Sequence, residues 1–191
     1  MGIDGRRAPT PVLNCLRRVT GPMHERLEQR FDAVSELSDP SRREATIARY
    51  ATFYSSAHQH LGTALGDVEG LQLSERDLAW RSLRFPAEAL DESIPFPRSA
   101  DHFEALGALY VVDGSALGGR LILNELRKRG GDETGLAFLD PYGKAGGSLW
   151  RSLLAVLERE GARGEAELEA ICHGAVQGFA HAERVLCGEP H

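Results

Sequence analysis

Two short stretches of this 191-residue chain carry residues whose types and spacing suit chemistry. The first holds His24 and Glu28, which are four residues apart. Residues at this spacing share one face of a helix, so the carboxylate of Glu28 can accept a hydrogen bond from the imidazole of His24. Such a bond fixes the ring tautomer and leaves the other nitrogen for a metal. A plainer and commoner interpretation makes His24 an edge residue of an amphipathic helix and Glu28 a surface charge.

The second stretch runs from Tyr110 to Arg120 and holds Gly114, Gly118 and Gly119. Each glycine inside a helix costs about 1 kcal/mol relative to alanine. Gly114 and Gly118 are four residues apart, so they bare one strip of backbone, against which a ligand can lie. Close packing of two helices explains these two glycines as well, but it explains Gly119 poorly. A local kink or an unwound turn covers all three.

Helical patterns surround both stretches and extend over most of the chain. Thr10 and Pro11 can cap a first helix, on whose inward face Leu16, His24 and Phe31 are expected. Gly21-Pro22 predicts a kink in this helix, or a fresh helix start just before His24. Further helices are expected at about 39–65, 74–90, 99–129, 148–160 and 165–186, with a doubtful last turn at Pro86 and a loop at 93–97.

The sequence therefore predicts an all-α fold, a single compact bundle of about six helices with no alternating strand pattern. Residues 10–187 form the expected domain, with a loose tail at 1–9 and a short one at 188–191. Gly130-Gly131 is expected to end the long helix that carries the three glycines.

Charge and composition exclude several functions. The formal net charge of −6 argues against a nucleic-acid partner, because proteins that bind the phosphate backbone of nucleic acids usually carry a surplus of basic residues. No apolar stretch approaches the roughly 20 residues of a membrane span, and the first ten residues lack the apolar run of a secretion signal. A ferritin-like di-iron site needs Glu three residues before His, and no histidine has it.

The three cysteines, Cys15, Cys172 and Cys187, are odd in number and form no CxxC motif. Neither a disulfide framework nor a zinc site is therefore suggested. Reduced thiols in a cytoplasmic protein are the simple expectation.

Three segments resemble, in the same order, segments of the bacterial biliverdin-producing heme oxygenases. Leu16–Glu28 resembles the proximal helix of that family, which implies that His24 binds heme iron and that Glu28 supports it. Tyr110–Arg120 resembles the kinked, glycine-rich distal helix, so that heme would lie between the two helices. Leu149–Glu158 resembles a stretch whose basic residue, here Arg151, pairs with a heme propionate.

The resemblance implies further roles. Arg17 stands where the family often has a propionate-binding base, and Tyr110, Gly114 and Phe179 would contact heme. Gly118 and Gly119 would lie over the heme face and leave room for O₂. The family position of a distal aspartate is occupied by Ser115, so either Ser115 with ordered water or Asp113 would supply protons, and Ser115 is favoured. Glu183 matches a weaker pattern of the family.

The implied activity is cleavage of heme, both substrate and cofactor, with O₂ and electrons to biliverdin, ferrous iron and CO. The electrons would come from a ferredoxin, a flavodoxin or a reductase, and the product can supply a bilin-accepting phytochrome. The alternatives are a heme-binding or heme-carrying protein of the same fold without turnover, and a helical interaction module without ligand.

Overall fold

The computed structural model describes residues 10–66, 68–83, 85 and 94–188. Within these ranges the chain is helical and contains no strand, which confirms the predicted all-α bundle. The helices are α1 (Pro11–Arg30), α2 (Ala33–Ser38), α3 (Pro40–Ala64), α4 (Leu73–Ser82), α5 (His102–Lys128), α6 (Gly146–Gly161) and α7 (Glu165–Cys187), with short 3₁₀ turns η2 (Ala137–Leu139) and η3 (Gly143–Ala145). The predicted tail at 1–9 and the last residues, 189–191, lie outside the described residues.

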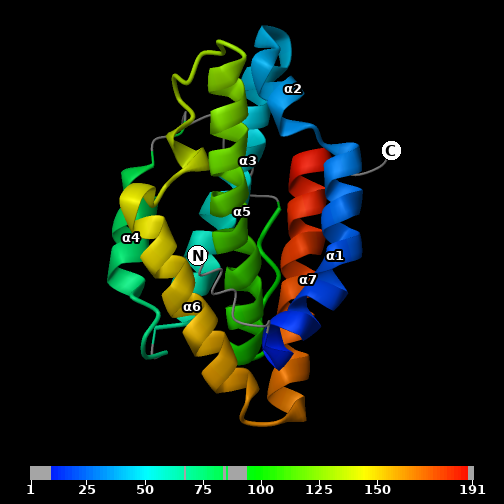
Figure 1. The fold of residues 1–191 in the computed structure, drawn as a ribbon, viewed down its shortest axis with the longest axis vertical. Helices are drawn as coiled ribbons and strands as arrows, with labels where there is room; N and C mark the ends of the chain where they lie inside the picture. The colour runs from blue at the N-terminus through cyan, green and yellow to red at the C-terminus, as the bar shows by residue number, and fades with distance from the viewer. Residues whose placement is uncertain (1–9, 67, 84, 86–93, 189–191) are drawn as a thin grey trace, which may run out of the picture.

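Helix α5 is the centre of the bundle (Figure 1). It packs against α7 on one side, and α1 lies along α7, while α6 packs on the other side of α5. Contact between α5 and α7 is close because Gly107 and Gly174 face the backbone of the opposite helix, where a Cβ atom has no room. The position of α1 is therefore set mainly through α7.

The sequence signals for helix ends are confirmed. The Thr10 hydroxyl accepts a hydrogen bond from the backbone N–H of Leu13, and Pro11 begins α1. At the end of α5, the N–H of Gly130 donates to the carbonyl of Arg127, and the N–H of Gly131 donates to that of Leu126. Gly130 has φ +70°, which glycine adopts readily, and the pair forms a Schellman cap.

Some boundaries differ from the prediction. Helix α1 continues through Gly21-Pro22, so the predicted fresh start before His24 is wrong. Helix α4 ends at Ser82, because the backbone of Leu83 is extended. The rest of the helix predicted to reach residue 90 includes positions 84 and 86–90, which lie outside the described residues, as does the start of the 93–97 loop. Helix α2 was not predicted.

Helix α5 departs from expectation in two further ways. It remains helical at every residue across its glycines, so the unwound turn considered above is wrong. By length and composition it is also long and apolar enough to cross a membrane, contrary to the prediction that no such segment exists. Half of that apolar stretch is buried within the bundle, as expected for the core helix of a globular domain.

Candidate functional site

One face of α5 is open and almost without side chains. A Cβ atom added to Gly114 or Gly118 would meet nothing within 4 Å. Tyr110, one turn earlier, is half-buried, and Leu121, one turn later, is 71% exposed. These four residues follow helical spacing and share one face. We call them the open strip of α5; it is an apolar surface that a flat ligand can approach closely.

Gly119 faces a different part of the molecule. It is buried, and a Cβ atom there would run into the backbone of Leu139 in η2. Packing therefore accounts for Gly119, which corrects the inference that packing explains this glycine poorly. The oxygen-site role expected for Gly119 has no support in this geometry, whereas Gly114 and Gly118 do lie on an open surface.

His24 lies on α1 with its side chain 60% exposed. The prediction that it lies on an inward face with Leu16 is wrong, because the buried face of α1 is formed by Val12, Leu16 and Thr20 and stops short of His24. The Nδ1 atom of His24 is 3.6 Å from a carboxylate oxygen of Glu28. The ring also contacts Phe179 of α7 edge-to-face, with centroids 5.9 Å apart. Glu28 thus stands at one nitrogen, and Nε2 is left for another partner.

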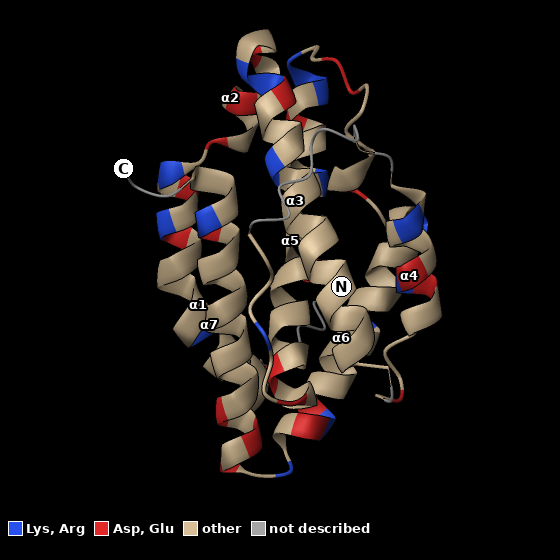
Figure 2. Cartoon of the chain, turned by 180° about the vertical axis from the view of Figure 1, so that it is seen from behind, with Lys and Arg blue, Asp and Glu red and all other residues tan. Residues whose placement is uncertain are grey.

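An ion-pair cluster holds the C-terminal half of α1 on α7. Glu183 of α7 accepts hydrogen bonds from Arg26 at 2.6 and 2.8 Å and from Arg30 at 2.5 Å. Hydrogen bonds from these two guanidinium groups lower the pKa of Glu183 to about 2. Figure 2 shows such neighbouring basic and acidic bands where α1 and α7 run together. Glu183 was singled out from the sequence, but its arginine partners were not; both follow His24 on α1 and anchor that stretch of the helix on α7.

Two arginines lie on the helices next to the Tyr110 end of the open strip, Arg17 on α1 and Arg151 on α6. The charge of Arg17 on α1 acts on the hydroxyl of Tyr110, where it opposes the rise in pKa that burial causes. The ring of Tyr110 lies 5.4 Å from that of Trp150 on α6, and Arg151 is the next residue. Arg17 and Arg151 are exposed. Two cations are thus available to anionic groups of a ligand.

Asp113 does not belong to the open strip. Its carboxylate is buried and accepts hydrogen bonds from Arg76 at 2.8 and 3.2 Å and from the hydroxyl of Tyr142 at 2.7 Å. Trp80 in turn donates to the hydroxyl of Tyr142 at 2.6 Å. Burial raises the pKa of Asp113, and the charge of Arg76 opposes that rise. This buried network, which sequence reasoning missed, ties α4 and the loop before α6 to α5.

Ser115 lies nearer to the open strip, as the residue after Gly114. Its hydroxyl donates to the carbonyl of Val112 at 2.7 Å, so the hydroxyl of Tyr54 at 2.9 Å acts as donor to Ser115. Burial raises the pKa of Tyr54 to about 12, so its hydroxyl is protonated at neutral pH. Tyr54 and Ser115 thus form a short chain of hydroxyl groups beside Gly114, and Tyr54 is a second residue that sequence reasoning missed.

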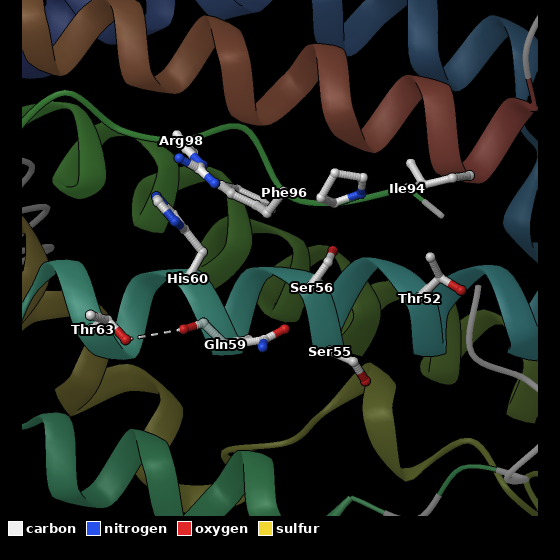
Figure 3. A pocket seen from close by; sticks show the side chains of 10 residues that line it. Thr52, Ser55, Ser56, Gln59, His60, Thr63, Ile94, Phe96 and Arg98 are labelled. Carbon is white, nitrogen blue, oxygen red and sulfur yellow. Dashed lines mark hydrogen bonds between the residues drawn. The ribbon is translucent and has the colours of Figure 1, made fainter. Parts of the chain in front are cut away.

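A separate polar cavity of about 580 Å³ lies between α3 and the segment 94–98 (Figure 3). His60, Phe96 and Arg98 are among the residues that line it. Burial and the charge of Arg98 lower the pKa of His60, whose Nε2 accepts a hydrogen bond from the N–H of Ser99. None of its lining residues is among the predicted heme contacts, so this cavity is distinct from the open strip.

A metal bound by His24 would need ligands from a cofactor. Among the described residues, no group of three or more His, Cys, Asp or Glu side chains could hold a metal ion. A porphyrin supplies its iron with ring nitrogens and needs only an axial side chain such as histidine from the protein. The open imidazole, the bare apolar strip and the two available arginines fit the iron, the flat ring and the carboxylates of such a group.

The fold defines the class as an all-helical bundle protein. A search of curated proteins finds a heme oxygenase of Xanthomonas campestris pv. campestris (strain 8004), 36% identical over 149 residues, which covers 73% of this chain and 82% of the relative. The chain belongs to the heme oxygenase family. No family model matches the sequence, and no solved structure matches it either.

Proposed function

We propose that this chain cleaves heme with O₂ and electrons to biliverdin, ferrous iron and CO, with heme as both substrate and cofactor. The observation that carries the proposal is the open imidazole of His24 in a family member whose central helix bares Gly114 and Gly118. When bound, heme supplies the iron that reacts with O₂. The protein binds heme, directs it and supplies protons.

His24 is proposed to bind the iron through Nε2. Glu28 stands 3.6 Å from Nδ1 and can fix the tautomer that leaves Nε2 free. Phe179 limits rotation of the ring from the side of α7. Because Arg26 and Arg30 anchor the same stretch of α1 on Glu183, the imidazole is carried by a fixed backbone.

The open strip is proposed as the distal surface, where O₂ is bound. Without Cβ atoms at Gly114 and Gly118, the backbone of α5 can come close to the ring and leave room for O₂ above it. Ser115 and Tyr54 are proposed to deliver protons through an ordered water, since Asp113 is already engaged by Arg76 and Tyr142.

Arg17 and Arg151 are proposed to hold the two propionates. Guanidinium–carboxylate pairs can be bidentate, so they fix the rotation of the ring in its plane as well as its affinity. The electron donor is proposed to be a ferredoxin, a flavodoxin or a reductase in the cytoplasm, with a bilin-accepting phytochrome as one destination of the product.

The test is His24→Ala, compared with His173→Ala as a matched control. His173 on α7 is also exposed and also pairs with a carboxylate, Glu104 at 2.9 Å. Each protein is mixed with hemin and then with a reductant under air, and the heme spectrum and biliverdin yield are recorded. His24→Ala should alter the spectrum and abolish biliverdin, while His173→Ala should match the parent.

Three results would contradict the proposal. If His24→Ala retains the parental spectrum and still yields biliverdin, His24 is not the iron ligand. If the parent binds hemin but gives no biliverdin with any of the three classes of donor, the chain is a heme-carrying protein instead. Absence of hemin binding would leave the interaction-module interpretation.

A further inference from the structure

Two cysteines that are far apart in sequence lie side by side in the bundle. Cys15 on α1 and Cys172 on α7 are separated by 157 positions, and their Sγ atoms are 2.6 Å apart. A disulfide bond is about 2.05 Å long, so a small movement of the two side chains is enough for bonding. The two helices pack along each other, which keeps the thiols together.

We propose that Cys15 and Cys172 form a reversible disulfide that fastens α1 to α7. All three cysteines are free thiols in the structure, as the sequence predicts, and the proposed bond would leave Cys187 unpaired. The bond would connect α1, which carries His24, to α7, which carries Phe179. Its formation requires neither heme nor turnover. In a reducing compartment, such a bond forms transiently under oxidation.

The surroundings give the two thiols different roles. Cys15 is partly exposed, and a guanidinium nitrogen of Arg18 lies 3.7 Å from its sulfur. Cys172 is buried, and burial together with the hydrogen bond to Cys15 raises its pKa to about 12. Cys15 is therefore the accessible nucleophile, and Cys172 is the thiol that resolves its oxidised form.

A peroxide such as hydrogen peroxide is a sufficient oxidant. The thiolate of Cys15 attacks one peroxide oxygen, the O–O bond breaks, and hydroxide leaves, which takes up a proton to give water and Cys15 sulfenic acid. The sulfur of Cys172 then attacks the Cys15 sulfur. The S–O bond breaks, and the oxygen leaves as a second water with the proton from Cys172. Two thiols lose two electrons in total, and the peroxide gains them.

The bond should also stabilise the fold. A disulfide restricts the unfolded chain more when it closes a longer loop, and this one spans most of the sequence. For a domain of this size, we expect the oxidised protein to melt roughly 10 °C higher than the reduced protein.

The experiment uses the full chain without heme, so its outcome is independent of the proposed enzymatic activity. Reduced protein is treated with hydrogen peroxide, free thiols are blocked with N-ethylmaleimide, and peptides are identified by mass spectrometry. Thermal melts follow with and without a reductant. The variants are Cys15→Ser and Cys187→Ser, and the latter is the matched control that retains the pair.

The expected result is a Cys15–Cys172 crosslinked peptide in the parent and in Cys187→Ser, with Cys187 of the parent still alkylated. Both proteins should melt higher when oxidised, and Cys15→Ser should not. Because Cys15 is only partly buried, its serine variant should fold. The proposal is overturned if Cys15 and Cys172 both remain alkylated after oxidation, or if either pairs with another chain or with Cys187.

Discussion

The two neighbouring glycines of α5 should respond in opposite ways to the same substitution. In Gly118→Ala the added methyl group meets no atom within 4 Å, so the helix gains alanine propensity without steric penalty. This gain is about 0.5–1 kcal/mol, which raises the melting temperature by roughly 1–4 °C for a chain of this length. In Gly119→Ala the methyl group would overlap the backbone of Leu139, which cannot move aside like the end of a side chain.

Overpacking of this kind typically costs about 1–3 kcal/mol and exceeds the helix-propensity gain. Gly119→Ala should therefore melt several degrees lower than the parent, with or without heme. Gly118→Ala should melt higher, yet it should make biliverdin about 10²-fold more slowly, because a methyl group on the open strip displaces the ring or O₂ from reacting geometry.

The assay pairs thermal melts of the heme-free proteins with single-turnover biliverdin formation after hemin is added. Gly114→Ala serves as a second variant on the open strip and should behave like Gly118→Ala. If Gly118→Ala and Gly114→Ala melt higher and turn over at the parental rate, heme does not lie against this strip. If Gly119→Ala melts higher than the parent, the packing account of Gly119 is refuted.

Three further changes test the surroundings of the site. Arg151→Ala should shift the biliverdin isomer ratio, resolved by chromatography, while heme affinity changes by only about 0–1 kcal/mol; unchanged isomers would remove its role. The folded pKa of Glu183 is lowered to about 2. The ionised carboxylate therefore adds to the free energy of unfolding above the unfolded pKa, and this contribution is lost as pH falls through 2. In urea titrations, Glu183→Gln should therefore lower the free energy of unfolding by about 1 kcal/mol at pH 7, a figure reduced because the arginines are exposed, and by almost nothing at pH 2. An equal loss at both pH values would contradict this. Tyr54→Phe removes the donor to Ser115, so it should slow biliverdin formation more than it weakens hemin binding, and an unchanged rate would exclude it from proton delivery.

Capping residues in the sequence predicted the ends of several helices correctly. Thr10-Pro11 and Gly130-Gly131 mark helix ends through capping chemistry that involves only residues nearby in sequence. The six-residue α2 was missed because a single short turn of helix carries too little periodicity to be seen. Pro22 did not interrupt α1, since the packing of a long amphipathic helix can compensate for one lost backbone hydrogen bond.

The site was predicted only where its geometry is local. The spacing of His24 and Glu28, and that of Gly114 and Gly118, follows from helix geometry alone. The exposure of His24 does not, because it depends on how α1 is placed against α7. The difference between Gly118, which is open, and Gly119, which is packed, likewise becomes visible only when η2 is placed against Gly119.

Helix α7 sets the geometry of the proposed heme site, although few of the proposed heme contacts lie on α7. Helix α1 is held on α7 near its start by the Cys15–Cys172 contact and near its end by the pairing of Arg26 with Glu183. Helix α7 packs directly on α5 through small residues, which leave little freedom between those two backbones. The separation of His24 from the open strip is therefore fixed indirectly, through α7. It follows that a change at either anchor should affect heme binding without touching heme.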